Sequence, residues 1–153
     1  MSELRDIAAT RGKLLGVDFG DKRTGLAICD PMRSIASGIG FVSPGGIEKC
    51  ADEVAKIAKS EGVVAIIVGL PVNMDGSEGS RAQRCRKFAW LLSERSELPV
   101  ACFDERMTTM TASRYLNETN TRGKKRKTVI DTLSAEIILQ NCIDRLKNMN
   151  VGE

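Results

Sequence analysis

The sequence predicts a single α/β domain over residues 1–153, built on a mixed β-sheet: three antiparallel strands, then alternating helices and strands, with helices flanking the sheet. Three observations predict this fold class. Short turns separate the strand-like segments early in the chain. The apolar period then lengthens from two residues to about 3.6, as in helices. The continuous apolar run at 63–70 is typical of a strand buried on both faces.

The first part of the chain predicts an antiparallel meander. Residues 1–12 show no clear period, so we expect them to form a flexible tail. Strands are predicted over 13–19, 23–29 and 35–42, because turn residues bound these apolar segments. The turn at 20–22 leaves hairpin spacing between the first two strands.

The rest of the chain alternates helices with strands. Apolar residues recur at helical spacing from Ile47 to Ala58, and Gly62 ends that pattern. A second helical stripe runs from Ala82 to Leu92. The remaining predicted segments are a strand at 63–70, a loop at 71–79, a strand at 100–105, helical signals at 109–116 and a final helix at about 129–146.

Composition excludes several kinds of site. The chain has no histidine, which excludes Ser-His-Asp triads, Cys-His pairs and histidine-ligated zinc. Its five cysteines are widely spaced without a C-x-x-C, so we expect buried core residues rather than disulfides or a zinc site. No apolar run approaches the ~20 residues of a membrane span, and the N-terminus does not resemble a signal peptide. We therefore expect a cytoplasmic protein without a membrane partner.

Positive charge is concentrated in one predicted loop, at 122–127. That segment holds five of the 23 basic residues, so 18 basic residues face 20 acidic ones in the rest of the chain. Such a run either is a solvated loop or contacts phosphates.

Three carboxylates occupy positions where a core favours apolar side chains. Asp18 lies within the first strand, Glu105 closes the strand at 100–105, and Asp131 begins the apolar stripe of the final helix. Unpaired buried carboxylates cost several kcal/mol, and a divalent cation neutralises them. We predict that these acids are catalytic and bind Mg²⁺ or Mn²⁺, with Asp104 as a weaker additional ligand.

Each acid also has a purely structural interpretation. Asp18 can pair with Lys22 or Arg23, and Glu105 with a nearby arginine. Asp131 can be a helix N-terminal acid that the helix dipole favours.

Four segments together resemble the YqgF family, also called RuvX. They are V-D-F-G-D-K-R-T-G-L-A from Val17, G-L-P-V-N-M-D-G-S-E-G from Gly69, F-D-E-R-M-T-T from Phe103 and V-I-D-T-L-S-A-E-I-I-L from Val129. The resemblance covers about residues 13–146 and implies an RNase H-like fold. It also implies that Asp18, Glu105 and Asp131 are the acids of the active site. The block at 125–131 is longer than the family's K-G-x-V-D and lacks its glycine.

Candidate nucleic-acid contacts surround these acids. The loop after the strand at 63–70 either is a turn that caps the next helix or covers the substrate. The basic and amide side chains predicted to contact nucleic acid are Lys22, Arg23, Asn73, Arg81, Arg84, Arg106, Lys124, Lys125, Arg126 and Lys127.

The resemblance implies a metal-dependent nuclease that matures the 5′ end of pre-16S rRNA. The alternatives are a Holliday-junction resolvase acting on branched DNA and a non-catalytic RNA-binding module. An actin-like or sugar-kinase-like ATPase needs two lobes, and the chain is too short for both. We expect a monomer or a homodimer, and a resolvase favours the dimer.

Overall fold

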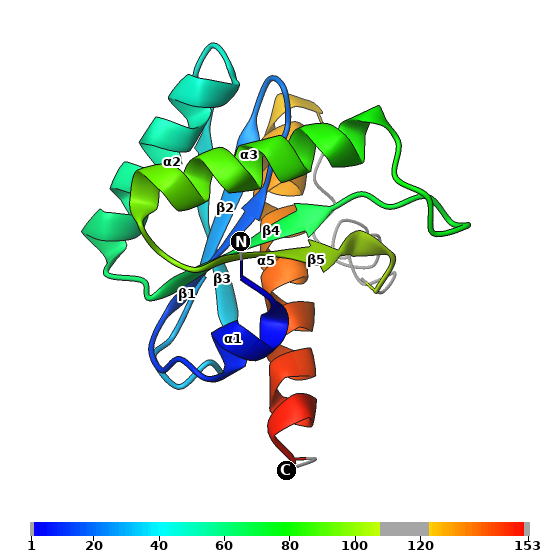
Figure 1. The fold of residues 1–153 in the computed structure, drawn as a ribbon. Helices are drawn as coiled ribbons and strands as arrows, with labels where there is room; N and C mark the ends of the chain where they lie inside the picture. The colour runs from blue at the N-terminus through cyan, green and yellow to red at the C-terminus, as the bar shows by residue number, and fades with distance from the viewer. Residues whose placement is uncertain (1, 108–122, 152–153) are drawn as a thin grey trace.

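The structure is a computed structural model that describes residues 2–107 and 123–151, with side chains for 2–106 and 132–149. Its elements follow the predicted order, with one additional helix at the start (Figure 1). They are α1 (Leu4–Ala8), β1 (Leu14–Asp18), β2 (Thr24–Cys29), β3 (Ala36–Val42), α2 (Ile47–Glu61), β4 (Ala65–Leu70), α3 (Ser80–Ser96), β5 (Val100–Asp104), the 3₁₀ turn η1 (Glu105–Met107) and α5 (Gly123–Val151).

One five-stranded sheet holds the described strands in the order β3-β2-β1-β4-β5. The meander β1–β2–β3 is antiparallel, whereas β1 pairs with β4, and β4 with β5, in parallel. Parallel neighbours require crossover connections, and α2 and α3 supply them. The mixed sheet predicted from the sequence is confirmed.

Helices cover both sides of the sheet (Figure 1). One side, here the α2–α3 face, holds a core cluster that includes Leu15 and Val17 of β1. The other side, here the α5 face, holds a second cluster that includes Leu14, together with α5 and α1. Side chains alternate along a strand, so Gly16 and Asp18 point to the α5 face with Leu14.

Close contact between α5 and the sheet depends on glycine. A Cβ at Gly16 would lie 2.7 Å from the Cβ of Leu139 and 3.2 Å from the carbonyl oxygen of Ala135. A larger residue at this position would push the helix away from β1. The glycine therefore positions the helix that carries Asp131.

The predicted flexible tail is instead an ordered segment. Residues 4–8 form α1, and the Ile7 side chain is fully buried. The backbone N–H of Ser2 donates to the carbonyl oxygen of Val100, and the Arg33 guanidinium donates to the carbonyl oxygen of Ile7. A five-residue helix is too short to show a period, so its single anchoring isoleucine gives no pattern in the sequence.

The predicted basic loop also differs from the structure. The α5 backbone is helical from Gly123, so residues 124–127 belong to the first turns of a helix rather than to a loop. Their side chains lie outside the described set. The predicted helical signals at 109–116 lie outside the described residues altogether.

The cysteines agree with their predicted role. All five are free thiols; four are buried and Cys102 is half-buried. No helix in the described part of the chain is long and apolar enough to cross a membrane.

Candidate active site

Two of the three predicted catalytic acids lie side by side on the α5 face. Val17 of β1 is in register with Val68 of β4, so Asp18 lies opposite Gly69, one residue further along these parallel strands. A Cβ at Gly69 would lie 2.7 Å from the Oε1 atom of Glu105, which places that carboxylate directly over the glycine. Asp18 and Glu105 therefore meet at the carboxyl end of β1 and β4, although they lie 87 positions apart in the printed sequence.

Gly69 makes this meeting possible. The missing side chain leaves the space that Glu105 occupies, and a Cβ there would also lie 2.6 Å from the Cδ1 atom of Ile138. Sequence reasoning did not identify Gly69 as a site residue. The available signal was a glycine inside the apolar run at 63–70, where such a residue marks a close approach by another group.

Burial disfavours the charged form of Glu105. Desolvation raises the pKa of Glu105, and the charge of Asp104 adds to this, whereas the positive charge of Arg81 opposes it. Burial also raises the pKa of the Cys85 thiol to about 12, and the charges of Glu105 and Asp18 add to the rise. Both carboxylates thus lie within electrostatic range of this one thiol on α3.

The third predicted acid lies on α5. Asp131 is one helical turn before Ala135, whose carbonyl oxygen lies next to Gly16 of β1. Its side chain is outside the described set, so its role stays a prediction. Among the side chains that are described, no group of three or more His, Cys, Asp or Glu residues could hold a metal ion.

The donor atoms of Asp18 and Glu105 are suitable for a hard cation. Mg²⁺ and Mn²⁺ prefer oxygen ligands, and this pair supplies carboxylate oxygens only. A cation would also offset the burial that raises the pKa of Glu105. The chemistry of the donor set therefore fits the predicted metal, with Asp18 and Glu105 as the residues that would hold it.

Asp104 is not brought to this pair. It alternates with Phe103, which lies in the α5-face core, so Asp104 points to the other face of the sheet with Cys102. Its Oδ2 atom accepts hydrogen bonds from Nη2 of Arg106 at 2.7 Å and from Nε at 3.0 Å. The hydrogen bonds from this guanidinium lower the pKa of Asp104.

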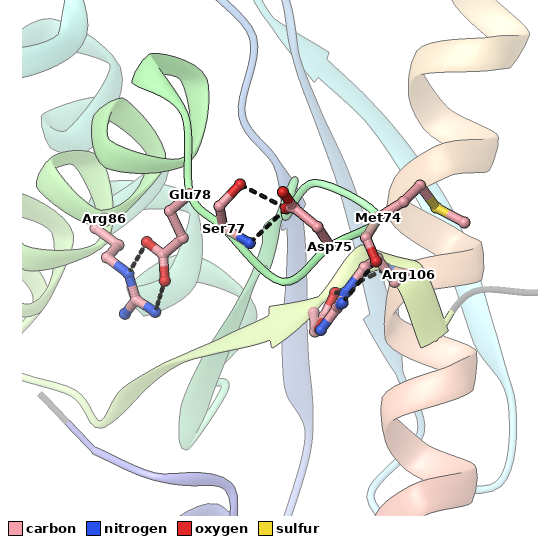
Figure 2. Close-up of polar contacts among 7 residues, drawn as sticks. Met74, Asp75, Ser77, Glu78, Arg86 and Arg106 are labelled. Atoms are coloured by element: carbon pink, nitrogen blue, oxygen red, sulfur yellow. Dashed lines mark hydrogen bonds and ion pairs between the residues drawn. The ribbon is translucent and has the colours of Figure 1, made fainter.

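The loop at 71–79 is a turn held by its own side chains (Figure 2). Asp75 Oδ1 accepts hydrogen bonds from the Ser77 hydroxyl at 2.6 Å and from its backbone N–H at 2.9 Å. The amide of Asn73 donates to the same hydroxyl at 3.1 Å. The predicted capping role is not seen, because the N-cap of α3 is Gly79 and no side chain caps it.

Arg106 connects this loop to the segment that carries Glu105. Its Nη1 atom donates to the carbonyl oxygen of Met74 at 3.5 Å, while its other nitrogens hold Asp104 (Figure 2). A second pair, Arg86 with Glu78, ties the end of the loop to α3. The guanidinium of Arg106, predicted to contact nucleic acid, is thus engaged within the protein.

The other predicted basic contacts lie around the β1–β2 turn and the start of α3. Arg84 pairs with Asp21, and its guanidinium lies 5.9 Å from the centre of the Phe19 ring. Arg23 lies 5.8 Å from the ring centre of Phe41. The carbonyl oxygen of Lys22 accepts a hydrogen bond from a serine hydroxyl. A cavity of about 300 Å³ is lined by Phe19, Gly20, Asp21, Ser80, Arg81 and Arg84.

Comparison with known proteins identifies relatives across nearly the whole chain. The family described as "RuvX: Holliday junction resolvase" matches residues 12–145. A "Putative pre-16S rRNA nuclease" of Rhodospirillum centenum is 38% identical over 96% of this chain and 81% of its own length. The protein of the same name from Phenylobacterium zucineum is 40% identical, with 96% of each chain covered.

Solved structures confirm the RNase H-like fold. The structure "T. thermophilus RuvC in complex with Holliday junction substrate" aligns with a TM-score of 0.58 at 11% identity, covering 90% of this chain and 96% of the other. "Thermus thermophilus RuvC structure" aligns with a TM-score of 0.51 at 12% identity, covering 89% and 96%. At such low identity, this likeness supports the fold alone.

Proposed function

The chain belongs to the RuvX family, and on that basis we propose that it is a divalent-metal-dependent nuclease that hydrolyses phosphodiester bonds in structured nucleic acid. The observation that carries the proposal is the pair Asp18 and Glu105: Asp18 ends β1 beside Gly69 of β4, and Glu105, from the turn η1 that follows β5, lies over that glycine. Two carboxylates gathered at one partly buried edge supply the oxygen ligands that Mg²⁺ and Mn²⁺ prefer.

The proposed roles follow from where each group lies. Asp18 and Glu105, with Asp131 from α5, would hold Mg²⁺ or Mn²⁺. Held there, such an ion would activate water and would stabilise the leaving oxygen of a phosphodiester. Arg81 acts on Glu105 electrostatically and lines the adjacent cavity, so its guanidinium is suited to hold a phosphate beside the acids. Glu105 is half-buried, so its carboxylate is only partly shielded from bulk water.

We assign 5′-end maturation of pre-16S rRNA, in the cytoplasm, as the reaction. The names of the relatives from Rhodospirillum centenum and Phenylobacterium zucineum support this substrate. A second candidate is cleavage of branched DNA, which the description of the matching family favours. That reaction requires two sites cutting symmetrically, so it goes with a homodimer.

Side-by-side cleavage tests the proposal. The protein is incubated with Mg²⁺, with Mn²⁺ or with EDTA, on a labelled pre-16S rRNA fragment and on a four-way DNA junction. We expect cleavage of the RNA that EDTA abolishes and that Asp18→Asn removes. Asp52→Asn is the matched control, because Asp52 is a half-exposed acid on α2 that pairs with Arg95.

Three outcomes would count against parts of the proposal. Cleavage of the junction alone would support the resolvase. Cleavage that persists in EDTA would overturn the metal dependence. Binding of RNA without cleavage under every condition would support the non-catalytic module.

A further inference from the structure

One aromatic side chain is exposed on the same face as the candidate acids. Of the four phenylalanines, Phe19, Phe88 and Phe103 are at most 5% exposed, whereas Phe41 is 37% exposed. It lies on β3, an edge strand of the sheet. An aromatic ring that stays partly on the surface is available to contact a planar partner.

A β-bulge turns Phe41 toward the α5 face. Leu26 pairs with Gly40 and Ala27 with Gly38, so β3 has one extra residue, Ile39, between these two pairs. Bulges re-aim the side chains that follow them. Before the bulge, Gly38 faces α5, since a Cβ there would clash with Thr132 of that helix.

After the bulge, the strand register aligns Phe41 with the candidate site. Phe41 pairs with Gly25 of β2, and Gly25 pairs with Asp18 of β1. Paired residues share a face, so Asp18, Gly25 and Phe41 form one row across the α5 face. The backbones of Phe41 and Asp18 are two strand spacings apart, a distance of about 10 Å.

Positive charge accompanies the ring. The Arg23 guanidinium lies 5.8 Å from the ring centre of Phe41, within the range of a cation–π contact. An aromatic face combined with a guanidinium is the combination with which proteins bind an unstacked base and its phosphate. A base inside an intact duplex offers no free face to such a ring.

We propose that Phe41 and Arg23 form a stacking platform that binds an unpaired base next to the scissile phosphate. The substrate class is then RNA with unstacked nucleotides at the cleavage position, rather than uninterrupted duplex. This inference rests on the proposed nuclease function, and it assigns the part of the site that selects the substrate. Phe41 is a binding residue here, and the acids remain the catalytic groups.

Binding without cleavage tests the platform directly. In an Asp18→Asn background, affinity is measured at one fixed salt concentration for a single-stranded RNA and for a duplex of the same sequence. We expect Phe41→Leu to weaken single-strand binding about 5- to 150-fold, the range of base–aromatic stacking, and to leave duplex binding unchanged. Phe41→Trp restores the affinity, and the fluorescence of a 2-aminopurine placed in the strand is quenched by stacking on the Trp protein but not by the Phe41→Leu protein.

The controls separate base stacking from misfolding and from general apolar contact. Phe41→Leu keeps an apolar side chain at the edge, and its circular dichroism spectrum checks the fold. Ile35→Ala removes an exposed apolar group that precedes the same strand and should leave both affinities unchanged. Equal binding by Phe41→Leu and the parent protein would overturn the platform.

Two further results distinguish the possible failures. Phe41→Leu can lower the molar mass measured by light scattering and weaken the binding of single-stranded and duplex RNA equally. In that case Phe41 belongs to a contact between two copies of the chain, and the platform is wrong. If the protein without the Asp18 substitution cleaves nothing, the nuclease proposal fails, while the binding comparison still decides the platform. If that protein cleaves and Phe41→Leu cleaves single strands equally fast, only the platform fails.

Discussion

Asp104 and Glu105 are neighbours in the chain, yet they lie in opposite environments. Asp104 closes β5 on the α2–α3 face, where the Arg106 guanidinium pairs with it and lowers its pKa. Glu105 begins the next turn on the α5 face, lies over Gly69 near Asp18, and has its pKa raised by burial. Two neighbouring carboxylates thus reach opposite faces of the sheet, because Asp104 ends β5 and Glu105 begins the 3₁₀ turn that follows it.

The difference shows that two adjacent acids of one short motif have different surroundings and so are suited to different roles. The ion pair of Asp104 holds Arg106, which reaches the Met74 carbonyl oxygen and so fixes the loop at 71–79. Glu105 lies on the opposite face from that ion pair, and its burial is a cost that a cation on the α5 face would offset. One acid of the motif supports structure, and we propose that the other supplies chemistry.

The largest expected effect is a difference in cleavage rate between variants of Glu105 and of Asp104. Glu105→Gln should lower cleavage about a thousandfold, because a metal ligand contributes several kcal/mol to the transition state. Its thermal stability should stay equal or rise, since a buried charge is removed. Asp104→Asn should keep activity within the same order of magnitude. Initial rates of both variants against the unmodified protein check this, and equal losses in the two would show that Asp104 belongs to the site.

Thermal stabilisation by a metal ion tests the roles of the acids without any substrate. An ion at 100 times its dissociation constant stabilises the folded state by about 2.7 kcal/mol. Melting curves with and without Mg²⁺ or Mn²⁺ should show this shift in the unmodified protein and in Asp104→Asn. Asp131→Asn should lose most of it. A full shift in Asp131→Asn would instead support the helix-dipole interpretation of that acid.

A smaller effect is expected from the backbone beneath Glu105. Gly69→Ala places a methyl group 2.7 Å from the Oε1 atom of Glu105 and 2.6 Å from the Cδ1 atom of Ile138, so both side chains must shift and we expect a loss of about 1–3 kcal/mol in unfolding free energy. Cleavage should fall with it, because Glu105 is displaced. Gly45→Ala is the control, since nothing lies within 4 Å of a Cβ there. Chemical denaturation of both variants measures the difference, and equal stabilities would contradict the close approach.

The strands and helices could be predicted because their apolar periods are long and regular. The helix at Leu4–Ala8 could not, since five residues with one buried isoleucine leave no period. The apolar stripe of the final helix was visible only from Asp131, so its earlier, strongly basic turns were predicted as a loop. Charge alone does not exclude a helix when the later turns pack against a sheet.

The site was partly predictable for a similar reason. Asp18 and Glu105 stood out because acids interrupt apolar strands, and alternation separated Asp104 from Glu105. Gly69 and Phe41 did not stand out. The role of Gly69 depends on a side chain 36 positions later in the printed sequence, and the orientation of Phe41 depends on a bulge at Ile39 that the strand pattern does not reveal.

The smallest expected effect is the opposite pH dependence of the two neighbouring acids. The folded-state pKa of Asp104 is lowered, so its stabilising contribution is present above the unfolded-state pKa and is lost as pH falls through the folded value. The folded-state pKa of Glu105 is raised, so its contribution is present at low pH and is lost as pH rises through that value.

Unfolding free energies of the two variants, measured in EDTA across the acid range, check these signs. The stability advantage of the unmodified protein over Asp104→Asn should shrink as pH falls, and it should never exceed about 1 kcal/mol, as for other exposed ion pairs. Glu105→Gln should gain stability relative to the unmodified protein as pH rises. Parallel pH profiles for the two variants would show that the acids share one environment, and the division of work between the two faces would then be wrong.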